Sequence, residues 1–149
     1  MISQKAKYAM RALVALARVE PGTSLMIGEI AESQAIPKKF LEQILLDLKR
    51  EGIVTSRRGK AGGYLMMRTP DAVSFGEVLR LIDGPLAPLP CLSKVAYHRC
   101  ADCSNESACE IRHVFAKVAE ATRDILDGTT LADSLTATAA GHTIPGLDA

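Results

Sequence analysis

Apolar residues recur at helical spacing in the first fifty residues of the chain. The pattern predicts one helix from about Ser3 to Val19 and a short second helix over residues 27–33. A third helix is predicted from Pro37 to about Arg50, because proline fits the first helical position. Its apolar stripe has the spacing i, i+3, i+4, i+7 and consists of Leu41, Ile44, Leu45 and Leu48.

The next thirty residues change from helical to extended patterning and back. Residues 53–57 and 64–68 are short, extended segments on either side of a glycine-rich turn at 58–63, which predicts a β-hairpin. Ser74 is a candidate N-cap for a helix over residues 75–82. Glu77 lies three residues later, as in a capping box.

Residues 84–108 show no periodicity, and Pro85, Pro88 and Pro90 argue against a helix. A long helix is predicted to follow, from about Ala108 to Leu126. Its apolar face consists of Ile111, Val114, Phe115, Val118, Thr122, Ile125 and Leu126. A short closing segment over 131–135 precedes a small, polar tail that we expect to be disordered.

This order of elements predicts a mainly α fold, a winged helix-turn-helix with a small β-hairpin wing and a long C-terminal dimerisation helix. We expect a DNA-binding domain over 1–83, a cysteine-rich loop over 84–108, a dimerisation helix and closing segment over 109–135, and a disordered tail over 136–149. The long helix has more apolar surface than so small a domain covers alone, which favours a homodimer.

Composition and charge sharpen this picture. The chain has 149 residues, of which 48% are hydrophobic; it contains no tryptophan and only 4% aromatic residues, so the core must be aliphatic. The formal net charge of +1 conceals an asymmetry, because residues 1–70 carry +6 and residues 71–149 carry −5. A basic first half favours a polyanion as the partner of that half.

The third helix carries polar side chains suited to a DNA duplex. In a helix-turn-helix the second helix enters the major groove with its N-terminal residues towards the bases. Lys38 and Lys39 could contact phosphates, Glu42 could accept a hydrogen bond from cytosine, and Gln43 could pair with adenine. The same residues would also suit an ordinary solvated helix face.

The turn of the hairpin is cationic. Arg57, Arg58 and Lys60 suit a wing lying over the DNA backbone, and an arginine there could enter a narrow minor groove. A flexible solvated turn is the alternative. The sequence does not favour a phosphate-binding P-loop, because no Gly-Lys-Ser/Thr and no following helix are present.

Four cysteines, the only ones in the chain, lie within nineteen residues. Cys91, Cys100, Cys103 and Cys109 have the spacing C-x8-C-x2-C-x5-C. Only the middle pair forms the C-x2-C knuckle typical of zinc, so the irregular set favours an iron–sulfur cluster, either [2Fe-2S] or [4Fe-4S]. Structural zinc, a thiol or disulfide switch, and four unligated thiols remain alternatives. His98 and His113 are weaker candidate ligands.

Other classes of function find no support in the sequence. No hydrolase constellation and no dinucleotide fingerprint occur, so we expect neither an enzyme nor a small-molecule substrate. Arg11 interrupts the apolar stretch near the N-terminus, and no run reaches the length of a membrane span. We therefore expect a cytoplasmic protein with no membrane partner, in which clustered thiols stay reduced. A winged-helix module that binds a partner enzyme is the remaining alternative.

Five stretches of the chain form a characteristic set: residues 7–13 (KYAMRAL), 40–45 (FLEQIL), 48–54 (LKREGIV), 56–65 (SRRGKAGGYL) and 130–135 (TLADSL). Together they resemble the IscR/NsrR/RirA-type family of bacterial winged-helix regulators. The resemblance implies a homodimer on a palindromic operator. It further implies groove reading by Glu42 and its neighbours, minor-groove insertion by Arg58, and a cluster on three cysteines.

By that resemblance Cys91 is the first ligand and Cys109 the last, while the middle ligand is either Cys103 or Cys100. Some family members supply a histidine three residues after the last cysteine, where this chain has Arg112. Others supply an aspartate from the first helix, where this chain reads Lys7-Tyr8. Cys100 could fill the vacant fourth position. The sequence leaves open the operator, the regulated genes, the direction of regulation and the signal, whether iron, redox state or nitric oxide.

Overall fold

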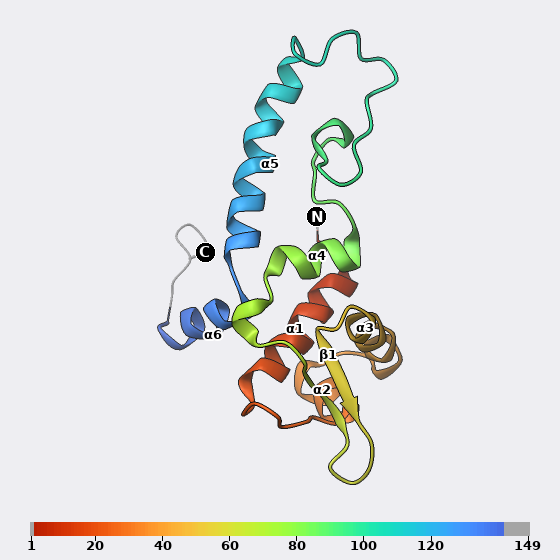
Figure 1. Ribbon diagram of the computed structural model, residues 1–149, viewed down its shortest axis with the longest axis vertical. Helices are drawn as coiled ribbons and strands as arrows, with labels where there is room; N and C mark the ends of the chain where they lie inside the picture. Colours follow the sequence, from red (N-terminus) through yellow and green to blue (C-terminus); the bar gives the residue numbers. More distant parts are fainter. Residues whose placement is uncertain (1, 142–149) are drawn as a thin grey trace.

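The computed structural model describes residues 2–141 and is mainly helical, with one two-stranded antiparallel sheet (Figure 1). Helices α1 (Gln4–Arg18), α2 (Ile27–Gln34) and α3 (Lys38–Arg50) precede strands β1 (Val54–Arg57) and β2 (Gly63–Met66). Helices α4 (Phe75–Asp83), α5 (Glu110–Gly128) and α6 (Leu131–Ala139) follow, with the short 3-10 turns η1 (Pro70–Ala72) and η2 (Pro90–Leu92). This confirms the predicted winged helix.

The core lies where α1, α2, α3 and the hairpin meet. All four apolar stripe residues of α3 are fully buried, together with Leu13 of α1 and Ile30 of α2. The predicted stripe is therefore confirmed as the inner face of α3. Its outer face carries mostly polar residues, together with the partly exposed side chains of Phe40 and Leu46.

Two local predictions need correction. Pro37 lies at the N-cap of α3 and not at its first helical position, so the helix begins at Lys38. Ser74 caps α4 as predicted, since its hydroxyl accepts from the backbone N–H of Glu77. Glu77 does not complete a capping box. Its carboxylate instead accepts from the Arg68 guanidinium at 2.5 Å, because that cation lies just after the hairpin and offers a charged donor.

The hairpin is joined to the body of the domain by a third extended segment. Leu25 and Tyr64 exchange backbone hydrogen bonds in both directions, each 2.8 Å long. Gly63 makes this approach possible: its φ is +133°, and a Cβ there would lie 2.2 Å from the Leu25 carbonyl oxygen. The wing thus leaves the domain in a defined direction, because only glycine fits between the two backbones.

Helix α5 and the loop before it extend away from this body as a separate lobe (Figure 1). Of the residues in α5, only Ala119 is buried. Helix α6 begins at Leu131, where the closing segment is predicted, and it continues to Ala139, beyond the predicted end of that segment at Leu135. The rest of the predicted disordered tail, from residue 142, lies outside the described residues. Within residues 2–141 no helix is long and apolar enough to cross a membrane.

Candidate functional site

The exposed face of α3 carries the polar residues that the sequence assigns to DNA reading. Lys38, Lys39, Glu42 and Gln43 are all exposed and lie in the first half of the helix. The basic residues of the wing form a second exposed group, since Arg57, Arg58 and Lys60 lie at the end of β1 and in the turn after it. The structure thus leaves all seven predicted residues accessible.

The seven side chains differ in whether they already bond to other groups of the protein. The Arg57 guanidinium donates to the Gly22 carbonyl at 3.1 Å, so this side chain ties the wing to the turn after α1. The side chains of Arg58 and Lys60 have no hydrogen bond or ion pair with the other described residues. Of the wing cations, these two are therefore the ones available to a phosphate.

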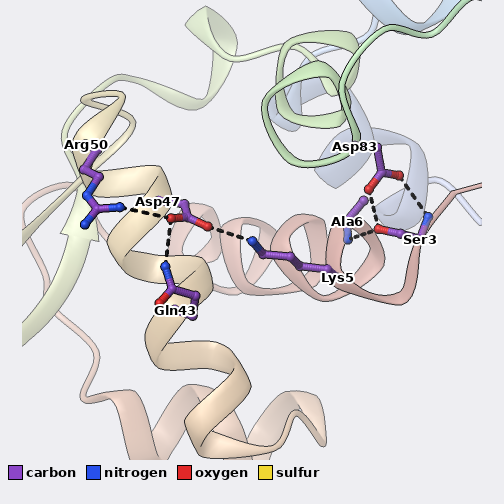
Figure 2. A network of polar contacts seen from close by, with 7 residues as sticks. All are labelled: Ser3, Lys5, Ala6, Gln43, Asp47, Arg50 and Asp83. Atoms are coloured by element: carbon purple, nitrogen blue, oxygen red, sulfur yellow. Dashed lines mark hydrogen bonds and ion pairs between the residues drawn. The ribbon is translucent and has the colours of Figure 1, made fainter.

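Sequence reasoning missed a residue of this face. Asp47 lies four residues after Gln43, and its Oδ1 accepts from Gln43 Nε2 at 3.0 Å (Figure 2). Its Oδ2 accepts from Lys5 Nζ of α1 at 2.8 Å. The hydrogen bond from Lys5 holds the pKa of Asp47 below its usual value, so the carboxylate remains charged near neutral pH. The i, i+4 spacing was the signal available in the sequence.

The four cysteines line a single cavity between the loop and the start of α5. Its volume is about 360 Å³, and its walls include Cys91, Cys100, Cys103 and Cys109. All four are free thiols: Cys91 in η2 is buried, Cys100 is exposed, and the other two are half-buried. Neither His98 nor His113 is among the lining residues, so the structure does not bring these predicted alternatives to the thiols.

The loop around this cavity is held by its own side chains. The Arg99 guanidinium donates to the carbonyls of Cys103 and Ser104 at 3.0 and 3.1 Å. The Tyr97 hydroxyl donates to the Glu106 carboxylate at 2.7 Å. These contacts give a segment without regular helices or strands a defined path, because charged and carboxylate hydrogen bonds are stronger than neutral ones.

Cys109 both lines the cavity and caps α5. It is the N-cap of α5, and its Sγ accepts from the backbone N–H of Arg112 at 3.4 Å. Arg112, whose Nε is buried without a hydrogen-bond partner among the described residues, also lines the cavity. An unpaired buried N–H is unfavourable and suits an anionic acceptor beside it.

The thiols are spread around the cavity rather than gathered at one point. Among residues 2–141, no group of three or more His, Cys, Asp or Glu side chains is close enough to hold a single metal ion. Partial desolvation, then the neighbouring Cys91 thiol and the Asp102 carboxylate, raise the pKa of the Cys100 thiol.

Known proteins resemble the chain over most of its length. The Rrf2 family model, described as an iron-dependent transcriptional regulator, matches residues 2–137. The rrf2-like protein of Rhodobacter capsulatus, a candidate HTH-type transcriptional regulator, is 51% identical over 140 residues, which cover 92% of this chain and 93% of that protein.

Two solved structures share the fold. CymR, the global cysteine regulator of B. subtilis, superimposes with a TM-score of 0.76 at 27% identity, covering 91% of this chain and 96% of that one. IscR of T. potens has a TM-score of 0.72 at 26% identity and covers 98% of this chain and 93% of its own. The chain therefore belongs to the Rrf2 family of DNA-binding transcription regulators.

Proposed function

We propose that this regulator binds a palindromic DNA operator as a homodimer, and that an iron–sulfur cluster held by its four cysteines controls that binding. The observation that carries the proposal is the convergence of Cys91, Cys100, Cys103 and Cys109 on one cavity at the N-terminus of α5. Sensing of this kind needs a cofactor attached to an element that can move the DNA-reading face.

The residues around the cavity suit a cluster better than a single ion. Zinc requires four ligands at tetrahedral positions around one point, whereas a polynuclear cluster takes ligands at separate iron atoms. Thiols that line one cavity without three of them meeting fit the second case. The unpaired Nε–H of Arg112 is a suitable donor to anionic sulfur, because second-shell hydrogen bonds of this type stabilise such clusters.

A bound cluster would supply a group whose oxidation or loss changes the loop chemically. The protein's own residues would transmit that change. Cys109 caps α5, so ligation of its sulfur constrains the first turn of this helix. Cys91 lies in η2, which packs against α5. A changed loop therefore alters the pose of α5, and with it the spacing of two reading heads across a dimer.

The exposed apolar face of α5 supports the dimer. Five large side chains along it are between 40% and 66% exposed in the single chain: Ile111, Val114, Phe115, Val118 and Ile125. Contiguous apolar exposure of this kind is unfavourable in water and marks an interaction surface. A second copy of the same helix, related by a twofold axis, would cover it with an identical stripe.

Anaerobic purification tests the cofactor. We expect a coloured protein with visible absorption and with iron and acid-labile sulfide in comparable amounts. A colourless protein with bound zinc, or one with a Cys–Cys disulfide that forms in air, would instead support the alternatives of structural zinc or a thiol switch. Cys100 next to Cys91 is the observation that favours the thiol switch as second candidate.

Salt dependence tests the wing. Replacing Arg58 with alanine removes one phosphate contact, so the slope of log affinity against log salt should fall by about 1. Replacing Arg57, which already bonds to Gly22, should change the slope less and lower the thermal stability more. A protein that DNA does not retain even at low salt, where phosphate contacts are strongest, would favour the partner-enzyme module over a DNA-binding role.

A further inference from the structure

Asp47 links the recognition helix to the core of the domain (Figure 2). Its carboxylate joins Gln43 of α3 at 3.0 Å to Lys5 of α1 at 2.8 Å, and Arg50 lies 3.6 Å away. The side chain of Asp47 is 23% exposed and that of Lys5 is 34% exposed, so the network lies at the edge of the α1–α3 contact. Asp47 thus holds the side chain of Gln43, while Lys5 of α1 holds the side chain of Asp47.

This arrangement restricts the amide of Gln43. A primary amide can turn over and exchange its oxygen and nitrogen positions at little cost in isolation. An ionised carboxylate only accepts hydrogen bonds, so the orientation with the amide oxygen towards Asp47 is opposed. The contact with Asp47 therefore commits one N–H of Gln43 and leaves its second N–H and its Oε1 available beside each other.

One donor and one acceptor side by side match one base edge in particular. Adenine presents N7 as an acceptor and its N6 amino group as a donor in the major groove. Guanine presents two acceptors, N7 and O6, which an amide with a single available N–H does not satisfy. We propose that Asp47 is a specificity-determining residue that orients the Gln43 amide for adenine and against guanine.

The charge of Asp47 is compatible with this role. A bare carboxylate on a recognition helix would repel the phosphates of the duplex. Here the cations Lys5 and Arg50 flank it, so the cluster has a net positive charge. Asp47 is a positioning residue that acts through Gln43, and the inference rests on the proposed role of α3 as the base-reading helix.

The test compares sequence preference among variants, using a pool of random-sequence duplexes as the probe. The wild-type protein should select adenine at one position in each half-site. An asparagine amide carries both a donor and an acceptor, so Asp47→Asn would let the amide of Gln43 turn over. The adenine-over-guanine preference at that position should then fall about tenfold. Asp47→Ala, which leaves the amide without a partner, serves as a second variant with the same expected loss.

Three controls distinguish a change in the orientation of the Gln43 amide from a change in overall DNA affinity. Glu51→Gln makes the same carboxylate-to-amide change at the C-cap of α3 and should keep the preference. Affinity for a duplex that lacks the selected half-site should change less than twofold in Asp47→Asn, because phosphate contacts set the strength of non-specific binding. The double variant Gln43→Ala with Asp47→Asn should be no worse than Gln43→Ala alone, because both changes remove one interaction.

The remaining results of this experiment each reject a particular part of the proposal. If Gln43→Ala loses the preference but Asp47→Asn keeps it, Asp47 has no orienting role, although base reading by α3 stands. An equal loss on all sequences with a lower unfolding midpoint would make Asp47 a tie between helices only. If Gln43→Ala changes no preference, or if the wild-type protein binds no duplex, the reading role in the proposed function is itself rejected, and the inference with it.

Discussion

Cys109→Ser protein purified without oxygen is expected to be colourless and to contain almost no iron or sulfide. A serine hydroxyl is a poor ligand for iron, and position 109 lies at the junction of the cavity with α5. Cys91→Ser should have the same result. The measurement is the visible spectrum together with iron and sulfide content, compared with those of the wild-type protein prepared in parallel.

The two middle cysteines should behave differently from each other. We expect Cys103→Ser to lose the cluster and Cys100→Ser to bleach or shift its absorption, because Cys100 would supply the fourth thiolate. Ala108→Ser is the matched control, since it places the same hydroxyl on the wall of the cavity without removing a thiol. An unchanged spectrum in Cys100→Ser would reject Cys100 as a ligand and leave three cysteines with a different fourth group.

The Cys109→Ser substitution should remove the cluster without unfolding α5. Cys109 caps α5 through the N–H of Arg112, and serine is a good N-cap. Cys109→Ser should therefore keep the helix content and the unfolding midpoint close to those of the cluster-free wild-type protein. A large loss of helix would instead mean that Cys109 is needed for folding, and that absence of iron in this variant says little about ligation.

Val118→Glu is expected to convert the dimer to monomers and to lower operator affinity by about a hundredfold or more. Val118 lies in the middle of the exposed apolar face of α5 and is 48% exposed in the single chain. Burying a glutamate against a second apolar helix is strongly unfavourable. Once the dimer dissociates, the second half-site no longer benefits from a high effective concentration of the second reading head.

Sedimentation velocity measures the oligomeric state, and titration of a two-half-site duplex measures affinity. Lys117→Glu introduces the same side chain one residue earlier, at an exposed position off the apolar face, and should stay dimeric. Binding of Val118→Glu to a single half-site should match that of the wild-type protein, because the reading face is unchanged. A Val118→Glu protein that remains dimeric would place the dimer interface elsewhere on the molecule.

The elements of the fold were largely predictable from the chain, because they rest on local rules. The i, i+3, i+4, i+7 stripe of α3 became its buried face without exception. The glycine-rich turn forms a hairpin, and Ser74 is the N-cap of α4. The capping-box prediction failed because a more distant side chain competed with a local group. The Glu77 carboxylate bonds to the Arg68 guanidinium instead of to the backbone N–H of Ser74.

The sequence by itself determined the winged-helix order, the cationic turn at Arg58 and Lys60, and the grouping of four cysteines in one segment. Each of these features depends only on residues that lie close together in the chain. Only the tertiary structure decided which groups meet. It placed all four thiols on one cavity without His98 or His113, used Arg57 to tie down the wing, and brought Lys5 to Asp47 across forty-two positions. Such contacts depend on how helices pack, and packing joins residues that no local periodicity relates.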